Sequence, residues 1–107
     1  MARFLCLWRR NPVAPWPTDP VEGSKLLEMI IACADNLMKK GEVKEFGLFL
    51  DGKSGYAIDE GDSATTFEHA SMFMPYIETE VHEIIPFEKG KEIMRAVMKA
   101  QAEAAMK

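Results

Sequence analysis

Residues 43–58 read Val-Lys-Glu-Phe-Gly-Leu-Phe-Leu-Asp-Gly-Lys-Ser-Gly-Tyr-Ala-Ile, and this stretch decides the fold. Strand-forming residues fill positions 43–50 and resume at 56–58. The segment Asp-Gly-Lys-Ser-Gly at 51–55 lies between them and is typical of a hairpin turn. A helical pattern precedes the hairpin and another follows it. We therefore predict two antiparallel strands at the centre of an α+β domain.

Upstream of the hairpin the sequence predicts a strand and a helix. Residues 2–8 carry apolar side chains on both faces of an extended chain, which favours an interior strand covered on both sides. A proline-rich loop at 11–18 follows. Asp19 and Pro20 are typical of a helix start, and Gly41 of its end. Between them, apolar residues recur at helical spacing: Leu27, Ile30, Ile31, Ala34, Leu37 and Met38.

Downstream, residues 61–63 (Gly-Asp-Ser) end the third strand and cap a second helix that Pro75 stops. Its expected core stripe is Phe67, Ala70, Phe73 and Met74. Residues 77–85 alternate as a fourth strand, and a third helix runs from Glu88 to the end with an apolar stripe. The order β-α-β-β-α-β plus a helix is the ferredoxin-like plan, a four-stranded antiparallel sheet with two helices on one face. We predict a single domain over residues 1–107.

Composition and charge exclude several classes of protein. The chain has 107 residues, 13 Lys and Arg against 17 Asp and Glu, and a net charge of −4, which disfavours nucleic acid and anionic membranes as partners. The apolar run at 4–8 is too short for a signal peptide and no segment is long enough to span a membrane, so we expect a cytoplasmic protein. Cys6 and Cys33 are expected to be reduced thiols.

Apolar residues on both sides of the strands also predict self-association. Two helices cover one face of such a sheet, and the other face needs a cover. A second copy of the same sheet is the simplest source, so we expect a homodimer or a higher multiple.

Residues 72–82 (Met-Phe-Met-Pro-Tyr-Ile-Glu-Thr-Glu-Val-His) resemble the junction between the second helix and the last strand of muconolactone isomerases. The similarity extends over roughly residues 20–87. It implies the dimeric α/β-barrel superfamily, which also contains small monooxygenases. The chain departs from the isomerases in a longer first loop, a differently spaced hairpin, and Glu45 where a basic or imidazole side chain is expected. No catalytic residue is therefore carried over from the family.

Acidic and imidazole side chains share faces of two predicted strands. Glu78, Glu80 and His82 alternate along the fourth strand, so they form a solvated polar edge, an acid–base pair or part of a metal site, with Val81 and Ile85 facing the core. Glu45 lies on the second strand with Val43 on its side. A covered Glu45 would suit a general base, and the alternative is an exposed or lysine-paired carboxylate. Gly47 beside it leaves space for a ligand or another backbone.

Further candidates are aromatic and basic. Trp8, Arg9, Arg10 and Trp16 flank the first loop and would either recognise a carboxylate or hold the loop and a partner subunit. Tyr76 either orients a ligand or packs with a bonded hydroxyl, and His69 is either a pocket acid or a residue on the flank of the second helix. The eight methionines line a cavity or fill ordinary core.

The leading functional hypothesis is a small-molecule protein, an isomerase or cofactor-free oxygenase acting on an apolar carboxylated compound. Its pocket would lie between sheet and helices, with its mouth at the loop 9–18. Glu45 or His82 would move the proton, Tyr76 would orient the ligand, and Arg9 or Arg10 would hold its carboxylate. We expect neither a cofactor nor a metal. The alternatives are a non-catalytic effector-binding or assembly module, which the third helix favours, and a haem- or metal-dependent enzyme.

Overall fold

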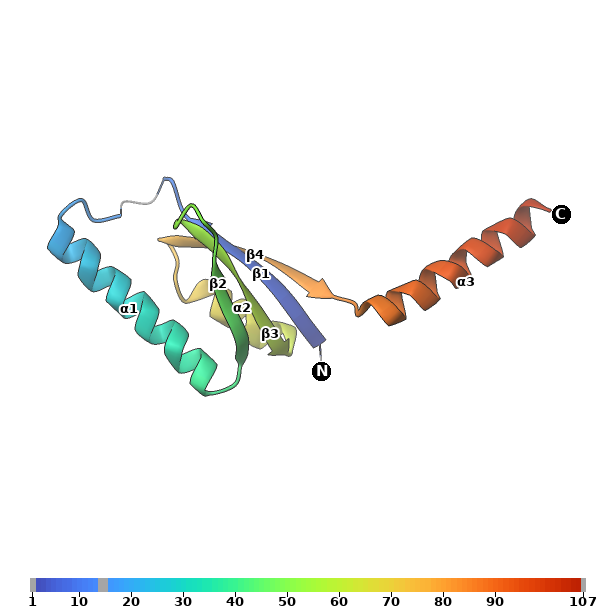
Figure 1. Ribbon diagram of the computed structural model, residues 1–107, viewed down its shortest axis with the longest axis horizontal. Helices are drawn as coiled ribbons and strands as arrows, with labels where there is room; N and C mark the ends of the chain where they lie inside the picture. Colours follow the sequence, from blue (N-terminus) through green and yellow to red (C-terminus); the bar gives the residue numbers. More distant parts are fainter. Residues whose placement is uncertain (1, 14–15, 107) are drawn as a thin grey trace.

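The computed structural model describes residues 2–13 and 16–106, which form four strands and three helices (Figure 1). Residues 1, 14–15 and 107 lie outside the described residues; residues 14–15 belong to the expected first loop and residue 107 to the expected last helix. The elements follow the predicted order: β1 (Ala2–Arg10), α1 (Pro20–Lys39), β2 (Val43–Leu48), β3 (Ser54–Gly61), α2 (Ser63–Ser71), β4 (Ile77–Ile84) and α3 (Phe87–Ala105). The predicted α+β fold with a ferredoxin-like topology and a C-terminal helix is confirmed.

The sheet is antiparallel with the strand order β2-β3-β1-β4, so β1 is an interior strand as predicted. We call the side toward α1 and α2 the helix face, and the other side the open face. The register assigns each strand residue to a face, because residues paired across an antiparallel ladder point to the same side. Cys6 pairs with Ala57 and Val81 on the helix face, whereas Leu7 pairs with residues of the open face.

A β-bulge at the start of β2 overturns one expectation. Val43 pairs with Asp59 and Glu45 pairs with Ile58, so the register shifts between them. The extra residue of a bulge reverses the face to which the following side chains point. Val43 is therefore buried in the core, and Glu45 is exposed on the open face. The prediction that Glu45 and Val43 lie on the same side of the strand was wrong.

The buried core is small and lies between the helix face and the first two helices. It consists of Phe4, Cys6, Leu37, Val43 and Ala57. On α2 the buried residues are Thr66 and His69, whereas Phe67, expected in the core stripe, is 72% exposed. The helix is turned this way because His69 hydrogen-bonds to the buried Asp59 of β3. The expectations for Phe67 and for a flanking His69 were wrong.

The end of β4 is less covered than predicted. Val81 lies on the helix face but is partly exposed, and Ile85 follows the strand and is exposed. The reason is the length of α2, which ends at Ser71 and covers only part of the sheet.

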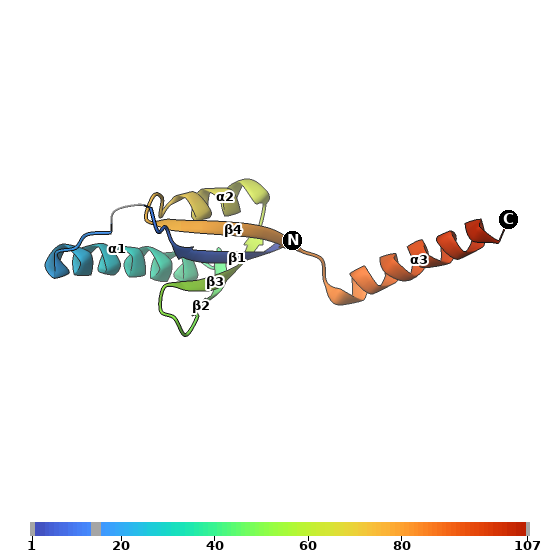
Figure 2. The same ribbon diagram turned by 90° about the horizontal axis from the view of Figure 1, so that it is seen from above.

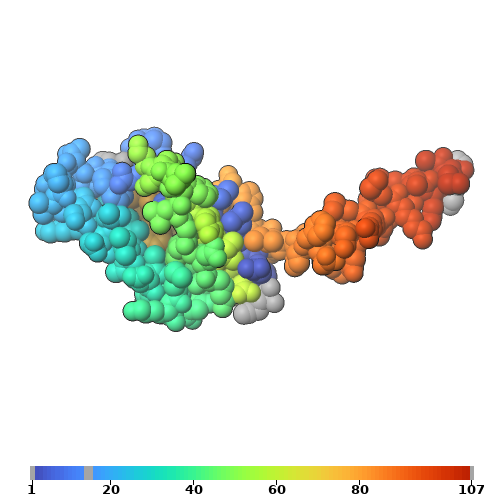
Figure 3. Space-filling view, in the orientation of Figure 1, coloured from blue at the N-terminus to red at the C-terminus, as the bar shows by residue number. Residues whose placement is uncertain are grey.

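The third helix stands apart from the rest of the described chain. None of its residues is buried, and it contacts none of the other helices or strands (Figures 1 and 2). The space-filling view shows it as a separate rod beyond the domain (Figure 3). The molecule consequently measures 70 × 30 × 24 Å. Among the described residues, no helix has both the length and the apolar character needed to cross a membrane.

Candidate functional site

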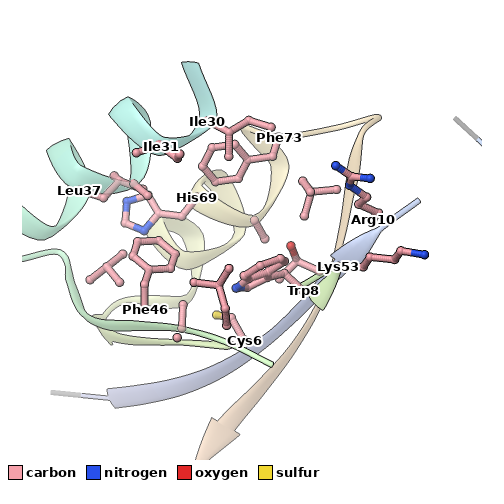
Figure 4. A pocket seen from close by; sticks show the side chains of 18 of the residues that line it. Cys6, Trp8, Arg10, Ile30, Ile31, Leu37, Phe46, Lys53, His69 and Phe73 are labelled. Atoms are coloured by element: carbon pink, nitrogen blue, oxygen red, sulfur yellow. The ribbon is translucent and has the colours of Figure 1, made fainter. Parts of the chain in front are cut away.

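A cavity of about 410 Å³ lies between the helix face of the sheet and the helices α1 and α2 (Figure 4). It exists because α1 contacts the sheet only along β2, so the rest of the helix stands off β1 and β4. The predicted stripe of α1 forms one wall: Leu27, Ile30, Ile31, Ala34 and Leu37. The opposite wall is formed by the helix face, including Cys6, Trp8, Phe46, Ala57 and Ile77. Most of this lining is apolar, as a pocket for a small molecule requires.

The indole of Trp8 occupies the middle of the sheet-side wall. It lies over Gly55, where a Cβ atom would overlap the ring and the carbonyl oxygen of Gly47. The Trp8 Nε1–H donates to the carbonyl oxygen of Tyr56 at 3.3 Å, which fixes the ring. Gly55 thus shapes the cavity, although the sequence indicated only a turn residue. The available signal was a glycine opposite a tryptophan across two strands.

One end of the cavity carries two cations. Arg10 and Lys53 lie there together, and the amide of Arg10 donates to the Lys53 carbonyl at 2.9 Å (Figure 4). The guanidinium of Arg10 lies 4.0 Å from the ring centre of Trp16, a cation–π contact. Trp16 in turn packs edge-on against Tyr76. Within residues 2–13 and 16–106, neither Arg10 nor Lys53 forms a salt bridge, although the Asp51 carboxylate lies close to Lys53: the pKa of Asp51 is lowered mainly by the hydrogen bond from the Lys53 amide and further by the lysine charge. This end of the cavity therefore carries two cationic side chains, one of them near an acid.

The opposite end is closed by His69, whose ring lies between Leu37 and Phe46 (Figure 4). The His69 Nδ1 lies 2.9 Å from the Asp59 Oδ2, and its Nε2 lies 2.8 Å from the Glu42 Oε2. Asp59 is 2% exposed and His69 is 9% exposed. Each ring nitrogen of His69 thus has a carboxylate within hydrogen-bond distance. We call these three residues the His69 clasp, because it joins α2, β3 and the connection that precedes β2.

The thiol of Cys6 also lines the cavity. Burial, and secondarily the charge of Asp59, raises the pKa of Cys6 to about 12. The thiol is therefore protonated at neutral pH and behaves as an apolar wall group rather than a nucleophile.

The structure places some of the predicted site residues at the cavity and others on the open face of the sheet. Four of them line the cavity: Trp8, Arg10, Trp16 and His69. Tyr76 does not line the cavity itself, but its ring packs edge-on against Trp16, which does. The other three, Arg9, Glu45 and His82, lie on the open face.

On the open face these charged groups are paired with neighbours. The Arg9 Nε donates to Glu78 at 2.9 Å, and His82 lies 2.6 Å from Glu80. The Tyr56 hydroxyl donates to the Glu45 carboxylate, and this bond is the main cause that raises the pKa of the phenol. The space left by Gly47 is filled by the Tyr56 ring rather than by a ligand.

In the part of the chain that the structure describes, no group of three or more His, Cys, Asp or Glu side chains is arranged to hold a metal ion. No protein-family model matches the chain, and no curated protein is significantly similar to it. The site is therefore interpreted from its geometry.

Proposed function

We propose that this domain binds an apolar carboxylate in the cavity, with the carboxylate between Arg10 and Lys53 and the apolar part directed toward His69. The observation that carries the proposal is the asymmetry of the cavity. Its walls are apolar, the cationic side chains of Arg10 and Lys53 lie at one end, and the clasp closes the other end with both of its carboxylates bonded to His69.

The magnitudes favour a ligand with both an apolar tail and a charged head. Each buried methylene contributes about 0.8 kcal/mol, so several of them are needed for measurable affinity. A hydrogen bond between charged groups contributes about 1.5–3 kcal/mol, which is enough to discriminate an acid from the corresponding alcohol. Trp16 fixes the Arg10 guanidinium in place, which lowers the entropy lost on binding.

The resemblance to muconolactone isomerases extends this proposal to a reaction. In that case the acid–base groups next to the ligand are His69 and Asp59, because both line the cavity. Glu45 and His82 lie on the other side of the sheet and would act only on a molecule bound there. Binding, rather than turnover, is the part that the geometry supports best.

Tryptophan fluorescence tests the binding proposal, because Trp8 and Trp16 both line the cavity. We expect octanoate to change the emission in a saturable way and octanol to bind more weakly. Arg10→Gln should weaken octanoate binding by about tenfold or more and leave octanol binding unchanged. Arg9→Gln is the matched control, because Arg9 pairs with Glu78 on the open face. Equal losses in the two variants, or no saturable binding of octanoate, would contradict the proposal.

The second candidate function is self-assembly through the open face, as in a dimeric α/β barrel. The centre of this face is apolar, with Leu5, Leu7 and Ile58 side by side on neighbouring strands. Its charges lie around that centre and are already paired with each other. An apolar centre with a neutralised polar rim is the usual anatomy of a protein–protein interface. Light scattering on the full chain measures the mass directly, and a monomer at all concentrations would exclude this candidate.

A further inference from the structure

The helix α3 presents a long apolar stripe that nothing in its own domain covers. The stripe contains Ile93, Met94, Val97 and Met98, each about half exposed or more. The opposite side is polar, with Glu92, Arg95 and Lys99. A helix that is amphipathic along its length normally packs its apolar side against another element.

The helix has little local stabilisation of its own. It starts at Phe87 after Pro86, and no side chain caps its first turn. Most helical stability in proteins comes from the packing of an amphipathic face against another element rather than from helix propensity. Two i,i+3 ion pairs near the start, Lys91–Glu88 and Lys89–Glu92, add only a few tenths of a kcal/mol each. A contact between its apolar stripe and another surface would therefore be the main source of stability for α3.

The chain leads from the last strand of the sheet directly into α3. Ile84 is the last residue of β4 and pairs with Arg3 on the open face. Ile85 and Phe87 follow it and are exposed, and the stripe of α3 begins at Ile93, in the second turn of the helix. A binding partner that covers the open face and extends past the end of β4 would also reach α3.

The areas favour such a joint contact. Four strands of about eight residues give a flat face of about 500 Å² at the usual strand dimensions. A stable interface buries about 800 Å² on each partner, so the sheet face alone is small. The 19 residues of α3 form a rod about 28 Å long that adds about 280 Å².

We propose that a second copy of this chain covers both surfaces together, so that α3 is an arm that holds its partner copy. The inference rests on the self-association proposed above and adds the surface that makes it stable. In a two-fold dimer the contact is reciprocal, and each copy contributes one arm.

Sedimentation velocity of the full-length protein over a range of concentrations tests the inference. Val97→Glu places a charge in the stripe, whereas Ala96→Glu places the same charge outside it. We expect Val97→Glu to weaken dimerisation by about a hundredfold, because it leaves a charge buried without a partner, and Ala96→Glu to leave it unchanged. Since α3 contacts no other element, neither change should unfold the domain. Leu7→Glu on the open face should also dissociate the dimer, with Ile84→Glu on the edge strand as a second variant.

The possible outcomes distinguish the proposal that α3 holds the partner copy from the proposal that the chain dimerises through its open face. If Val97→Glu stays dimeric while an open-face variant dissociates, the arm is wrong and the sheet contact stands. If Val97→Glu dissociates while both open-face variants stay dimeric, the helices associate alone and the joint contact is wrong. A monomeric wild-type chain would overturn both proposals. Equal dissociation of Val97→Glu and Ala96→Glu would also overturn the arm.

Discussion

The two faces of the sheet share one packing arrangement but differ in the surface that it helps to form. On each face an aromatic ring lies across a glycine of the neighbouring strand: Trp8 over Gly55 on the helix face, and Tyr56 over Gly47 on the open face. Trp8 forms the wall of a cavity whose two cations, Arg10 and Lys53, form no salt bridge among the described residues. Tyr56 is bonded to Glu45 within a surface whose charges are paired. One face is electrostatically incomplete, which suits a small anion, and the other is neutralised, which suits a broad contact.

The largest expected effect comes from breaking the buried histidine pair and comparing it with the exposed one. His69→Ala leaves Asp59 buried without its partner, so the free energy of unfolding should fall by about 3–5 kcal/mol. His82→Ala removes an exposed pair with Glu80 and should change stability by less than about 1 kcal/mol. Urea denaturation measures both. A small loss for His69→Ala would mean that the clasp contributes little to the fold.

The two glycine–aromatic pairs allow a sharper test of the faces. Gly55→Ala should displace Trp8 and the Gly47 carbonyl of the neighbouring strand, cost about 3 kcal/mol or more of stability through overpacking, and weaken octanoate binding. Gly47→Ala meets only the Tyr56 side chain, so it should displace that ring at a smaller cost, about 1–3 kcal/mol, while leaving octanoate binding intact. Denaturation and tryptophan fluorescence together check the pair. Loss of binding in both variants would show that the faces are not independent.

The smallest perturbation uses the two thiols without changing the sequence. Burial raises the pKa of Cys6 to about 12, so iodoacetamide should modify it far more slowly than the partly exposed Cys33 at mildly alkaline pH. Mass spectrometry of timed samples should show one adduct in the native protein and two after denaturation. Rapid double modification of the native chain would mean that the helix face opens to solvent.

The sequence was sufficient for the order of elements because the local signals agree with the tertiary structure. Asp19 and Asp62 accept amide hydrogens at the starts of α1 and α2, as their positions indicate. Apolar side chains on both faces correctly identified β1 as an interior strand. The cavity lies between sheet and helices, the position in which the sequence predicted a pocket.

The predictions that were wrong concern features that depend on residues far away in the chain. No local pattern shows the bulge that separates Val43 from Glu45, because it is defined by pairing with β3. Helical periodicity selected Phe67, whereas Asp59, on another element, determines that His69 is buried. Adjacent arginines point to opposite faces of a strand, so the choice between Arg9 and Arg10 required the register.

The attachment of α1 has a consequence for selectivity. This helix meets the sheet along β2, and the connection that follows it is held by the His69 clasp. An element secured near one end behaves as a lever, and a small tilt changes the width of the space under its free part. The free part of α1 lies toward Trp16 and the end with Arg10 and Lys53, whereas the clasp holds the end toward which the tail of the proposed ligand points. In the proposed binding mode the domain should therefore be strict about the bulk of the tail next to the clasp and more tolerant of the size of the head group.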